Sequence, residues 1–409
     1  MRKARELMLA LAAAALLAAG ACVKSPTETG GAGGGGGGAA KGGAVRIGFS
    51  MDTLKEERWQ RDKMLVEQHA KEVGADLTTV VANGNDATQL SQVDNLLTRG
   101  VDVLIVAPHN GVAASAIVEK AHAAHVPVIS YDRLIMNSDV DLYVSHQVPK
   151  IGEMQAQYAL DHQPKGNYVL IFGSQTDNNA LLLKGGQMKV LQPAIDRGDI
   201  KVVAEQYARE WLPSEARRIM DDALTKANND IQAVVASNDG TAGGAISAFP
   251  PQLTGKVLVT GQDAQLDACQ RIVRGEQTMT IYKPIKPLAY SAVDNALKLA
   301  RHEKIDAPDK INNQKIDVPA ILQTPIAVDK SNIADTIIKD GYQPLEKVYE
   351  GIPKDQWPKQ TASATQGGPQ PSEGGGQKAA GSRHSTLSAA LAVFGLLLGG
   401  AAVFARRRR

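Results

Sequence analysis

The stretch VDVLIVAPHNGVAASAIVEKAHAAHVPVISY, residues 101–131, decides the fold class. It begins and ends in short runs rich in Val and Ile, 101–107 and 126–131, and the segment between them, 112–125, has the spacing of an amphipathic helix. A strand that is apolar nearly throughout is buried on both faces, and two such strands joined by a helix form a parallel pair with a right-handed crossover. This unit therefore predicts an α/β fold with parallel sheets.

The same alternation extends outward from this unit in both directions. Further strand-like runs lie at 45–49, 77–82, 168–172, 201–206, 233–237, 257–260 and 279–282. Amphipathic helical segments lie at 56–73, 87–99, 151–162, 181–197 and 215–228. The units fall into two groups of about four, each long enough to bury its own core. We therefore predict two doubly wound lobes.

Charge and cysteine content exclude several function classes. The 409 residues carry a formal net charge of +2, but eleven basic and three acidic side chains lie outside 45–360, which leaves that block with 34 basic and 40 acidic side chains, a net of −6. An acidic block is a poor match for nucleic acid. The two cysteines, Cys22 and Cys269, support neither a disulfide framework nor a zinc–thiolate site. No GxGxxG or GxxxxGK[ST] follows a strand, so we expect no cofactor, no metal and no nucleic-acid partner.

The N-terminus has the composition of an export signal. Residues 1–22 contain three basic side chains among the first five, then an apolar run, then small residues before Cys22. This pattern resembles a bacterial lipoprotein signal, in which Cys22 is acylated and becomes the new N-terminus; ordinary cleavage near Ala21 is the alternative. Residues 23–44 form a Gly-rich tether.

The C-terminus predicts a second attachment. Residues 361–386 have the composition of a disordered linker. Residues 387–409 are an apolar run followed by four arginines, long enough to cross a hydrocarbon core with the arginines in the cytoplasm. The pattern also resembles a cleavable sorting tail, so the segment is either retained or removed. Both ends predict an exported protein, in the periplasm or on the outer face of the cell membrane, that is tethered there.

Polar side chains and two tryptophans follow the predicted strands. In open parallel sheets, ligands bind beyond the carboxyl ends of the strands. A sugar hydroxyl both donates and accepts hydrogen bonds, and the C–H face of a sugar ring packs on an indole, so Asp, Asn, Arg, Lys and Trp suit a sugar. Trp59 and Trp211 could then stack on opposite faces of one ring. We interpret Asp52 and Asp239, which also follow strands, as helix caps.

Longer stretches resemble a known family. They include RIGFSMDTLKEERWQRDK (46–63), VPVISYDRLI (126–135), KGNYVLIFGSQTDNNA (165–180), AVVASNDGTAGGAI (233–246), VLVTGQDAQL (257–266) and TMTIYKPI (278–285). Over about 45–345 the chain resembles the sugar-binding periplasmic binding proteins of ABC importers, of the D-xylose-binding type.

This resemblance implies a type I architecture, in which two lobes are joined by a three-segment hinge. The N-lobe would comprise 45–138 plus about 285–322, and the C-lobe 139–284 plus about 323–358. The residues that match the family's ligand-binding pattern are Arg58, Trp59, Asp132, Arg133, Asn178, Asn179, Trp211, Asn238, Asp263 and Lys283.

The resemblance also implies the function: capture of a monosaccharide, D-xylose first, by closure of the lobes, and delivery to the membrane subunits of an ABC importer. His109, Leu181 and the segment 145–148 depart from the family's pattern, so glucose, arabinose and ribose stay open as ligands. Presentation of the sugar to a chemoreceptor or sensor kinase is an alternative.

A sugar-modifying enzyme would need Asp132 and Asp263 as an acid/base pair, which the neighbouring Arg133 and Lys283 disfavour, so we expect no enzyme. A DNA-binding regulator is excluded because the signal and tether occupy the position of its DNA-binding helices.

Overall fold

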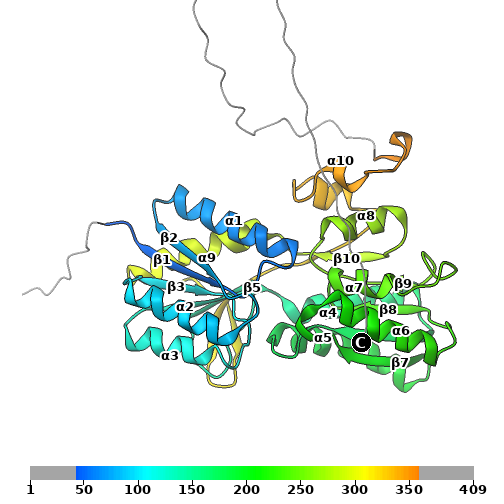
Figure 1. Cartoon of the computed structure of the whole chain (residues 1–409), viewed down its shortest axis with the longest axis horizontal. Coiled ribbons are helices and arrows are strands. Elements are labelled where there is room, and N and C mark those ends of the chain that lie inside the picture. Colours follow the sequence, from blue (N-terminus) through cyan, green and yellow to red (C-terminus); the bar gives the residue numbers. More distant parts are fainter. Residues whose placement is uncertain (1–42, 359–409) are drawn as a thin grey trace, which may run out of the picture. The chain divides into compact units, whose positions relative to one another are not determined.

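The computed structural model describes residues 43–358 (Figure 1). The predicted signal at 1–22 with Cys22, nearly all of the tether at 23–44, the linker at 361–386 and the apolar segment at 387–409 lie outside these residues. Within 43–358, no helix combines the length and the apolarity needed to span a bilayer.

A seven-stranded sheet forms the first half of the structure. Its strand order is β11-β12-β5-β4-β3-β1-β2, and all neighbours are parallel except β11 and β12. The strands are β1 (Arg46–Met51), β2 (Asp76–Val81), β3 (Val103–Val106), β4 (Val128–Tyr131), β5 (Leu142–His146), β11 (Asp309–Asn312) and β12 (Asp317–Gln323).

Helices cover both faces of this sheet because its central strands are apolar on both sides. In β3, Val103 and Ile105 pack against α1 (Glu57–Glu72) and α9 (Ile285–Ala300). The alternate residues, Leu104 and Val106, pack against α2 (Asp86–Thr98) and α3 (Ser115–Ala123). We call this half the N-lobe.

The second half, the C-lobe, is built in the same way. Its sheet has the parallel order β7-β6-β8-β9, formed by β6 (Gly166–Phe172), β7 (Ile200–Tyr207), β8 (Ala233–Ala236) and β9 (Leu258–Val259). The helices α4 (Val148–His162) and α5 (Asn178–Asp196) pack on one face. The helices α6 (Pro213–Lys226) and α7 (Asp239–Ile246) pack on the other.

A smaller antiparallel pair, β10 (Met279–Tyr282) with β13 (Ile326–Asp329), adjoins this sheet. Together with α8 (Leu266–Arg274) and α10 (Leu345–Val348) it encloses a separate apolar cluster, in which Cys269 is fully buried.

The chain crosses between the lobes three times. It passes from β5 to α4, from β10 to α9 and from β12 to β13. The predicted fold class is confirmed: two doubly wound parallel-sheet lobes joined by three segments. The first crossing follows His146, whereas the predicted lobe boundary lay at 138, because β5 pairs with β4 and β12 and so belongs to the N-lobe.

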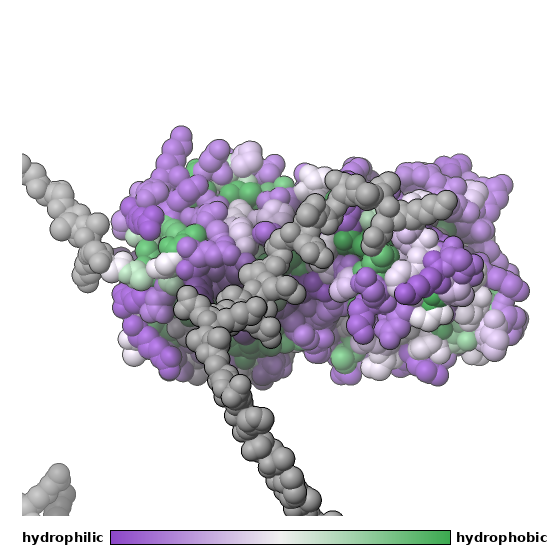
Figure 2. Space-filling model, turned by 90° about the horizontal axis from the view of Figure 1, so that it is seen from above, coloured by the Kyte–Doolittle hydropathy of each residue, from purple (hydrophilic) through white to green (hydrophobic). Residues whose placement is uncertain are grey.

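The surface of the lobes is mostly hydrophilic, with apolar residues in small patches (Figure 2). Few large apolar side chains of the described residues are exposed, and the most exposed are Val112 and Met64. The apolar residues that the sequence pattern assigns to strands are in the cores.

Candidate functional site

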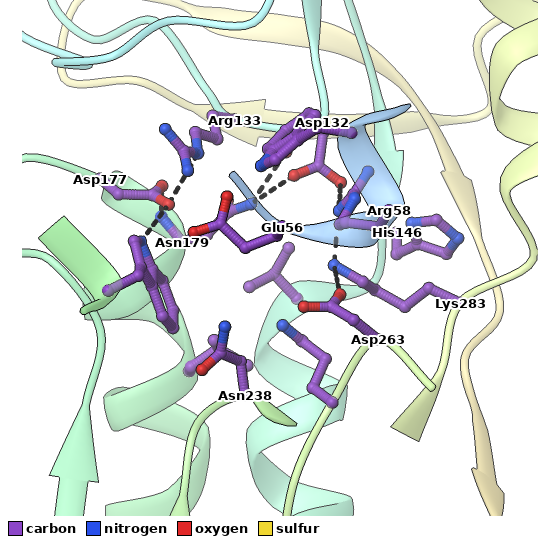
Figure 3. A pocket seen from close by; sticks show the side chains of 15 residues that line it. Glu56, Arg58, Asp132, Arg133, His146, Asp177, Asn179, Asn238, Asp263 and Lys283 are labelled. Atoms are coloured by element: carbon purple, nitrogen blue, oxygen red, sulfur yellow. Dashed lines mark hydrogen bonds and ion pairs between the residues drawn. The ribbon is translucent and has the colours of Figure 1, made fainter. Parts of the chain in front are cut away.

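A cavity lies between the lobes at the carboxyl ends of the parallel strands (Figure 3). The empty space at this site, including the part that is open to solvent, is about 460 Å³. Both lobes and two of the crossing segments contribute its lining residues, which are Glu56, Arg58, Trp59, Asp132, Arg133, His146, Val148, Asp177, Asn179, Leu183, Trp211, Asn238, Gln262, Asp263 and Lys283.

All but one of the predicted contact residues line this cavity. The exception is Asn178, whose Cβ lies near Gly111 of the N-lobe. Asn178 and Asn179 are consecutive residues at the start of α5, where successive side chains point about 100° apart, so only one of them faces inward. Cys22, the predicted lipidation site, lies outside the described residues.

A row of alternating charges crosses the cavity wall. Arg58 Nη1 donates to Asp132 Oδ2 at 2.7 Å, and Lys283 Nζ lies 3.9 Å from the same oxygen and 2.9 Å from Asp263 Oδ1. Burial alone would raise the pKa of Asp132, but the nearby cations Arg58 and Lys283 hold that pKa well below its usual range. Asp132 is therefore an anion throughout the physiological pH range, and it orients two cations.

Arg133 ties the two lobes together on the other side. Its Nη1 donates to Asp52 Oδ2 at 2.7 Å within the N-lobe, and its Nε lies 2.8 Å from Asp177 Oδ2 of the C-lobe. Trp211 Nε1 donates to the same Asp177 oxygen at 3.2 Å. A guanidinium, a carboxylate and an indole thus hold one another in place across the cleft.

The two aromatic side chains differ in their surroundings. The guanidinium carbons of Arg58 and Arg133 lie 4.2 and 5.1 Å from the centre of the Trp59 ring, so cations already occupy part of the surface that we assigned to a sugar. Trp211 lies against Gly173, where an added Cβ would be 2.1 Å from the indole. Only glycine fits at position 173, because any side chain there would displace Trp211.

Three site residues have strained backbones. Asp132, Trp211 and Asp263 have φ angles of 61°, 56° and 97°, a region that side chains other than glycine rarely adopt. Such conformations persist only where the surrounding structure over-determines them, and they cluster at functional sites.

The interpretation of Asp52 as a helix cap is wrong. Glu56 precedes α1, and Asp52 instead binds Arg133 and accepts a hydrogen bond at 2.9 Å from His109 Nδ1. Asp239 is likewise not a cap: Asn238 caps α7 by accepting from the backbone N–H of Thr241. Since the carboxamide oxygen of Asn238 is engaged in this way, its NH₂ group faces the cavity as a donor.

His109 should make stability depend on pH. The hydrogen bond to Asp52 raises its pKa, and Glu210 of the C-lobe and Asp86 add to the effect, although burial opposes it. Because the pKa of His109 is higher in the folded protein than the unfolded value of about 6.5, its protonation stabilises the fold. This contribution to the free energy of unfolding is fully present below about pH 6.5 and is lost as the pH rises through the folded-state pKa. Thermal unfolding should therefore show the largest difference between wild type and His109→Gln near pH 6, shrinking by pH 9.

His302→Asn is the control for this series, because the His302 ring is exposed and forms no ion pair among the described residues. A wild-type–His109→Gln difference that does not vary with pH would contradict the assignment.

Sequence reasoning missed four polar residues that line the cavity: Glu56, His146, Asp177 and Gln262. Asp177 and Gln262 follow strands beside predicted residues in the TDNNA and GQDA motifs, but they were not among the residues that match the family's ligand-binding pattern. Glu56 precedes a helix, and His146 ends a strand that was not predicted, so no strand-end signal marked either residue.

His146, which lines the cavity, has a nitrogen that can accept a hydrogen bond. Burial, with Lys283 nearby, lowers its pKa to about 3, so the imidazole is neutral and carries one N–H. Nε2 lies 3.3 Å from the carbonyl of Pro284, which can only accept, so the proton is on Nε2. Nδ1 is therefore a free acceptor.

Three buried acceptor atoms of residues that line this cavity have no hydrogen-bond donor from the protein. They are Glu56 Oε2, His146 Nδ1 and Asp263 Oδ1, the last of which forms an ion pair with Lys283 that lacks hydrogen-bond geometry. Buried polar atoms are nearly always hydrogen-bonded, and an unpaired one costs about 1–3 kcal/mol. A molecule with several donors would satisfy all three. No group of three or more His, Cys, Asp or Glu side chains in residues 43–358 is arranged to hold a metal ion.

Comparisons with known proteins agree with this geometry. The profile of the periplasmic binding protein domain matches residues 47–304. The D-xylose-binding periplasmic proteins of Haemophilus influenzae and Escherichia coli are each 49% identical to the chain; the alignments cover 75% and 73% of this chain and 92% and 91% of those proteins.

A carbohydrate transporter solute binding protein from Chloroflexus aurantiacus, solved in complex with D-glucose, superposes with a TM-score of 0.69 and 33% identity. The superposition covers 74% of this chain and 97% of that one. Family profile, sequence relatives and structural neighbours all lead to the same conclusion. The chain belongs to the family of periplasmic binding proteins.

Proposed function

We propose that this protein captures a neutral monosaccharide, D-xylose in the first place, in the cavity between its lobes and delivers it to the membrane subunits of an ABC importer. The observation that carries this proposal is the set of three buried acceptors that have no hydrogen-bond donor from the protein, Glu56 Oε2, His146 Nδ1 and Asp263 Oδ1. Sugar hydroxyls are donors that can reach acceptors on several sides of one small ring.

The balance of charge favours a neutral ligand. Four carboxylates (Glu56, Asp132, Asp177 and Asp263) and three cations (Arg58, Arg133 and Lys283) line the cavity, and Arg58, Arg133 and Lys283 each already contact a carboxylate. A charged ligand would have to break one of these pairs, whereas hydroxyl groups can bind beside them. Two relatives that are named for D-xylose and a structural neighbour with D-glucose support an aldose.

Ligand capture proceeds by lobe closure. The lining residues come from both lobes, so a bound sugar contacts both at once and shifts the population toward the closed form. The importer then recognises the closed form, as would a sensor that uses the same capture step. Attachment through acylated Cys22 or the segment 387–409 would keep the protein near that partner; loss of acyl labelling in Cys22→Ser checks the first of these.

The geometry favours binding over catalysis. The candidate acid/base pair, Asp132 and Asp263, shares Lys283, and the low pKa of Asp132 makes it unable to act as a general acid near neutral pH. The residues of the site are therefore arranged to form hydrogen bonds with a bound ligand rather than to transfer protons to it.

Isothermal titration with D-xylose, D-glucose, L-arabinose and D-ribose tests the proposal, and D-xylonate serves as an anionic control. We expect one-to-one binding, tightest for D-xylose, with the sugar recovered unchanged. Absence of heat with all four sugars, tighter binding of xylonate, or conversion of the sugar would each refute the proposal.

A further inference from the structure

A second set of contacts joins the lobes outside the cavity, at the start of α1. We propose that Glu57 is a positioning residue: with Arg61 and Gln343 it forms a latch that holds the lobes closed and so sets the affinity for the ligand without touching it. This inference rests on the proposed function, because it concerns how firmly the same cavity retains a sugar.

The Glu57 carboxylate accepts two hydrogen bonds from the other lobe. Oε2 accepts from the backbone N–H of Leu266 at 2.8 Å, and Oε1 accepts from Gln343 Nε2 at 2.8 Å. Leu266 is the first residue of α8, where backbone N–H groups have no partner within the helix and the helix dipole favours an anion. An acidic side chain of the N-lobe thus binds the N-terminus of a C-lobe helix.

Arg61, one turn along α1, completes the latch. Its Nη2 lies 2.9 Å from Glu57 Oε1 and donates to Gln343 Oε1 at 3.0 Å, and its guanidinium carbon lies 4.5 Å from the centre of the Tyr342 ring. Gln343 is 1% exposed, and the Arg61 and Glu57 side chains are 27% and 31% exposed, so these hydrogen bonds are partly shielded from bulk water. By contrast, the other bridge near this edge, from Lys55 Nζ to the carbonyl of Glu210, is solvent-exposed and should contribute little.

The latch also reaches the strained loop that presents Asp263. Gln343 Nε2 donates to the carbonyl of Ala264 at 3.0 Å, and the Tyr342 hydroxyl donates to the carbonyl of Asp263 at 3.1 Å. Asp263 and Ala264 both have positive φ angles, 97° and 50°. Gln343 therefore donates one hydrogen bond to Glu57 of the N-lobe and another to the loop that contains Asp263.

Among the hydrogen bonds of the latch, lobe opening would break those that Glu57 and Arg61 make to the C-lobe. Those to Ala264 and Asp263 lie within the C-lobe and would survive. The latch therefore contributes to the balance of open and closed forms, and the apparent affinity for any sugar scales with the closed fraction. Neither Glu57 nor Gln343 lines the cavity, so the effect should not depend on which sugar is bound.

The test measures D-xylose and D-glucose binding and dissociation for Glu57→Ala and Glu57→Gln. We expect Glu57→Ala to weaken both sugars by the same factor, about 10-fold or more, mainly through faster dissociation. The affinity of Glu57→Gln should lie between those of the wild type and Glu57→Ala. The amide oxygen of the new side chain can still accept from Leu266, but the negative charge is lost. Glu67→Ala is the control: Glu67 lies on the same helix but contacts only Lys63 and Thr79 of its own lobe. Unchanged affinity in Glu57→Ala, or an altered xylose-to-glucose ratio, overturns the latch.

A second readout needs no sugar. Spin labels at Lys71→Cys and Gln252→Cys, both exposed and in different lobes, report the distance between the lobes in the full-length chain. Cys22→Ser removes one native thiol, and Cys269 is buried. If the wild type binds no sugar, the proposed function fails on its own. The latch is then judged by whether Glu57→Ala moves the distance distribution toward longer separations; an unchanged distribution overturns it.

Discussion

Asp132→Asn should lower the affinity for D-xylose by about 100-fold or more. Asp132 is 3% exposed and lies between Arg58 and Lys283, so the substitution leaves two buried cations without their shared anion at the centre of the site. A sugar hydroxyl that donates to this carboxylate would lose a hydrogen bond to a charged group, which typically contributes about 1.5–3 kcal/mol. Asn tolerates the positive φ of this position, so the backbone should not change.

The folded protein should survive this substitution. Arg58 keeps Asp62, which it contacts at 3.0 Å, and Lys283 keeps Asp263, so we expect the free energy of unfolding to fall by only about 1–3 kcal/mol. Titration calorimetry and thermal unfolding without sugar measure the two effects separately. Asp139→Asn, which removes an exposed ion pair with Lys315, should change neither. An affinity within threefold of wild type would show that Asp132 does not organise the site.

Trp211→Ala should reduce both sugar affinity and stability. The indole is 8% exposed and fills the space over Gly173, and removal of a buried tryptophan typically costs 3–5 kcal/mol in the free energy of unfolding. Its loss also leaves Asp177 without the Nε1 donor, so the carboxylate that binds Arg133 across the cleft is held only by Arg133 and by the backbone N–H of Asn179. We expect the affinity to fall by about 30-fold or more, from lost stacking and a displaced Arg133.

Two variants separate the contribution of Trp211 to sugar affinity from its contribution to stability. Trp211→Phe retains a flat ring but not the donor, so it should recover part of the affinity. Trp357→Ala removes an indole that packs in the C-lobe near Tyr349, away from the cavity, and should lower stability without changing the affinity. If Trp211→Ala binds D-xylose as tightly as wild type, Trp211 has only a packing role.

The doubly wound lobes were predictable because their central strands are buried on both faces. β3 and β4 are short runs of Val and Ile joined by a helical segment, and burial forces that composition wherever helices cover both sides of a sheet. The strands β5, β11, β12 and β13 were not predicted from local pattern. β5 is LYVSH, with polar residues at its carboxyl end, and its place is fixed by pairing with β12, which is distant in sequence. The local composition of a strand does not indicate which distant strand it pairs with.

Most of the cavity lining was named from the family's ligand-binding pattern, and the rule that ligands bind beyond the carboxyl ends of parallel strands pointed to the same places. That rule draws attention to Asp132, Asn238 and Asp263, because each follows a strand. It could not show that Asn178 points away while Asn179 points inward, since that depends on where α5 begins. Nor could it find Glu56, which precedes α1, or show that Asp52 binds Arg133 rather than capping a helix.

The order of strands in the N-lobe has a consequence for how the chain matures. β5 pairs with β4 on one side and with β12 on the other, and β12 is made only after the whole C-lobe sheet. While the chain emerges from a ribosome or a translocation pore, the N-lobe therefore carries an unpaired sheet edge, and its helix α9 is also still missing. The half of the molecule that is begun first can therefore be completed only after most of the other half has been made. A chain with this connectivity stays incompletely folded while it is threaded, which suits passage through a secretion channel and makes prompt capture by a holding chaperone valuable.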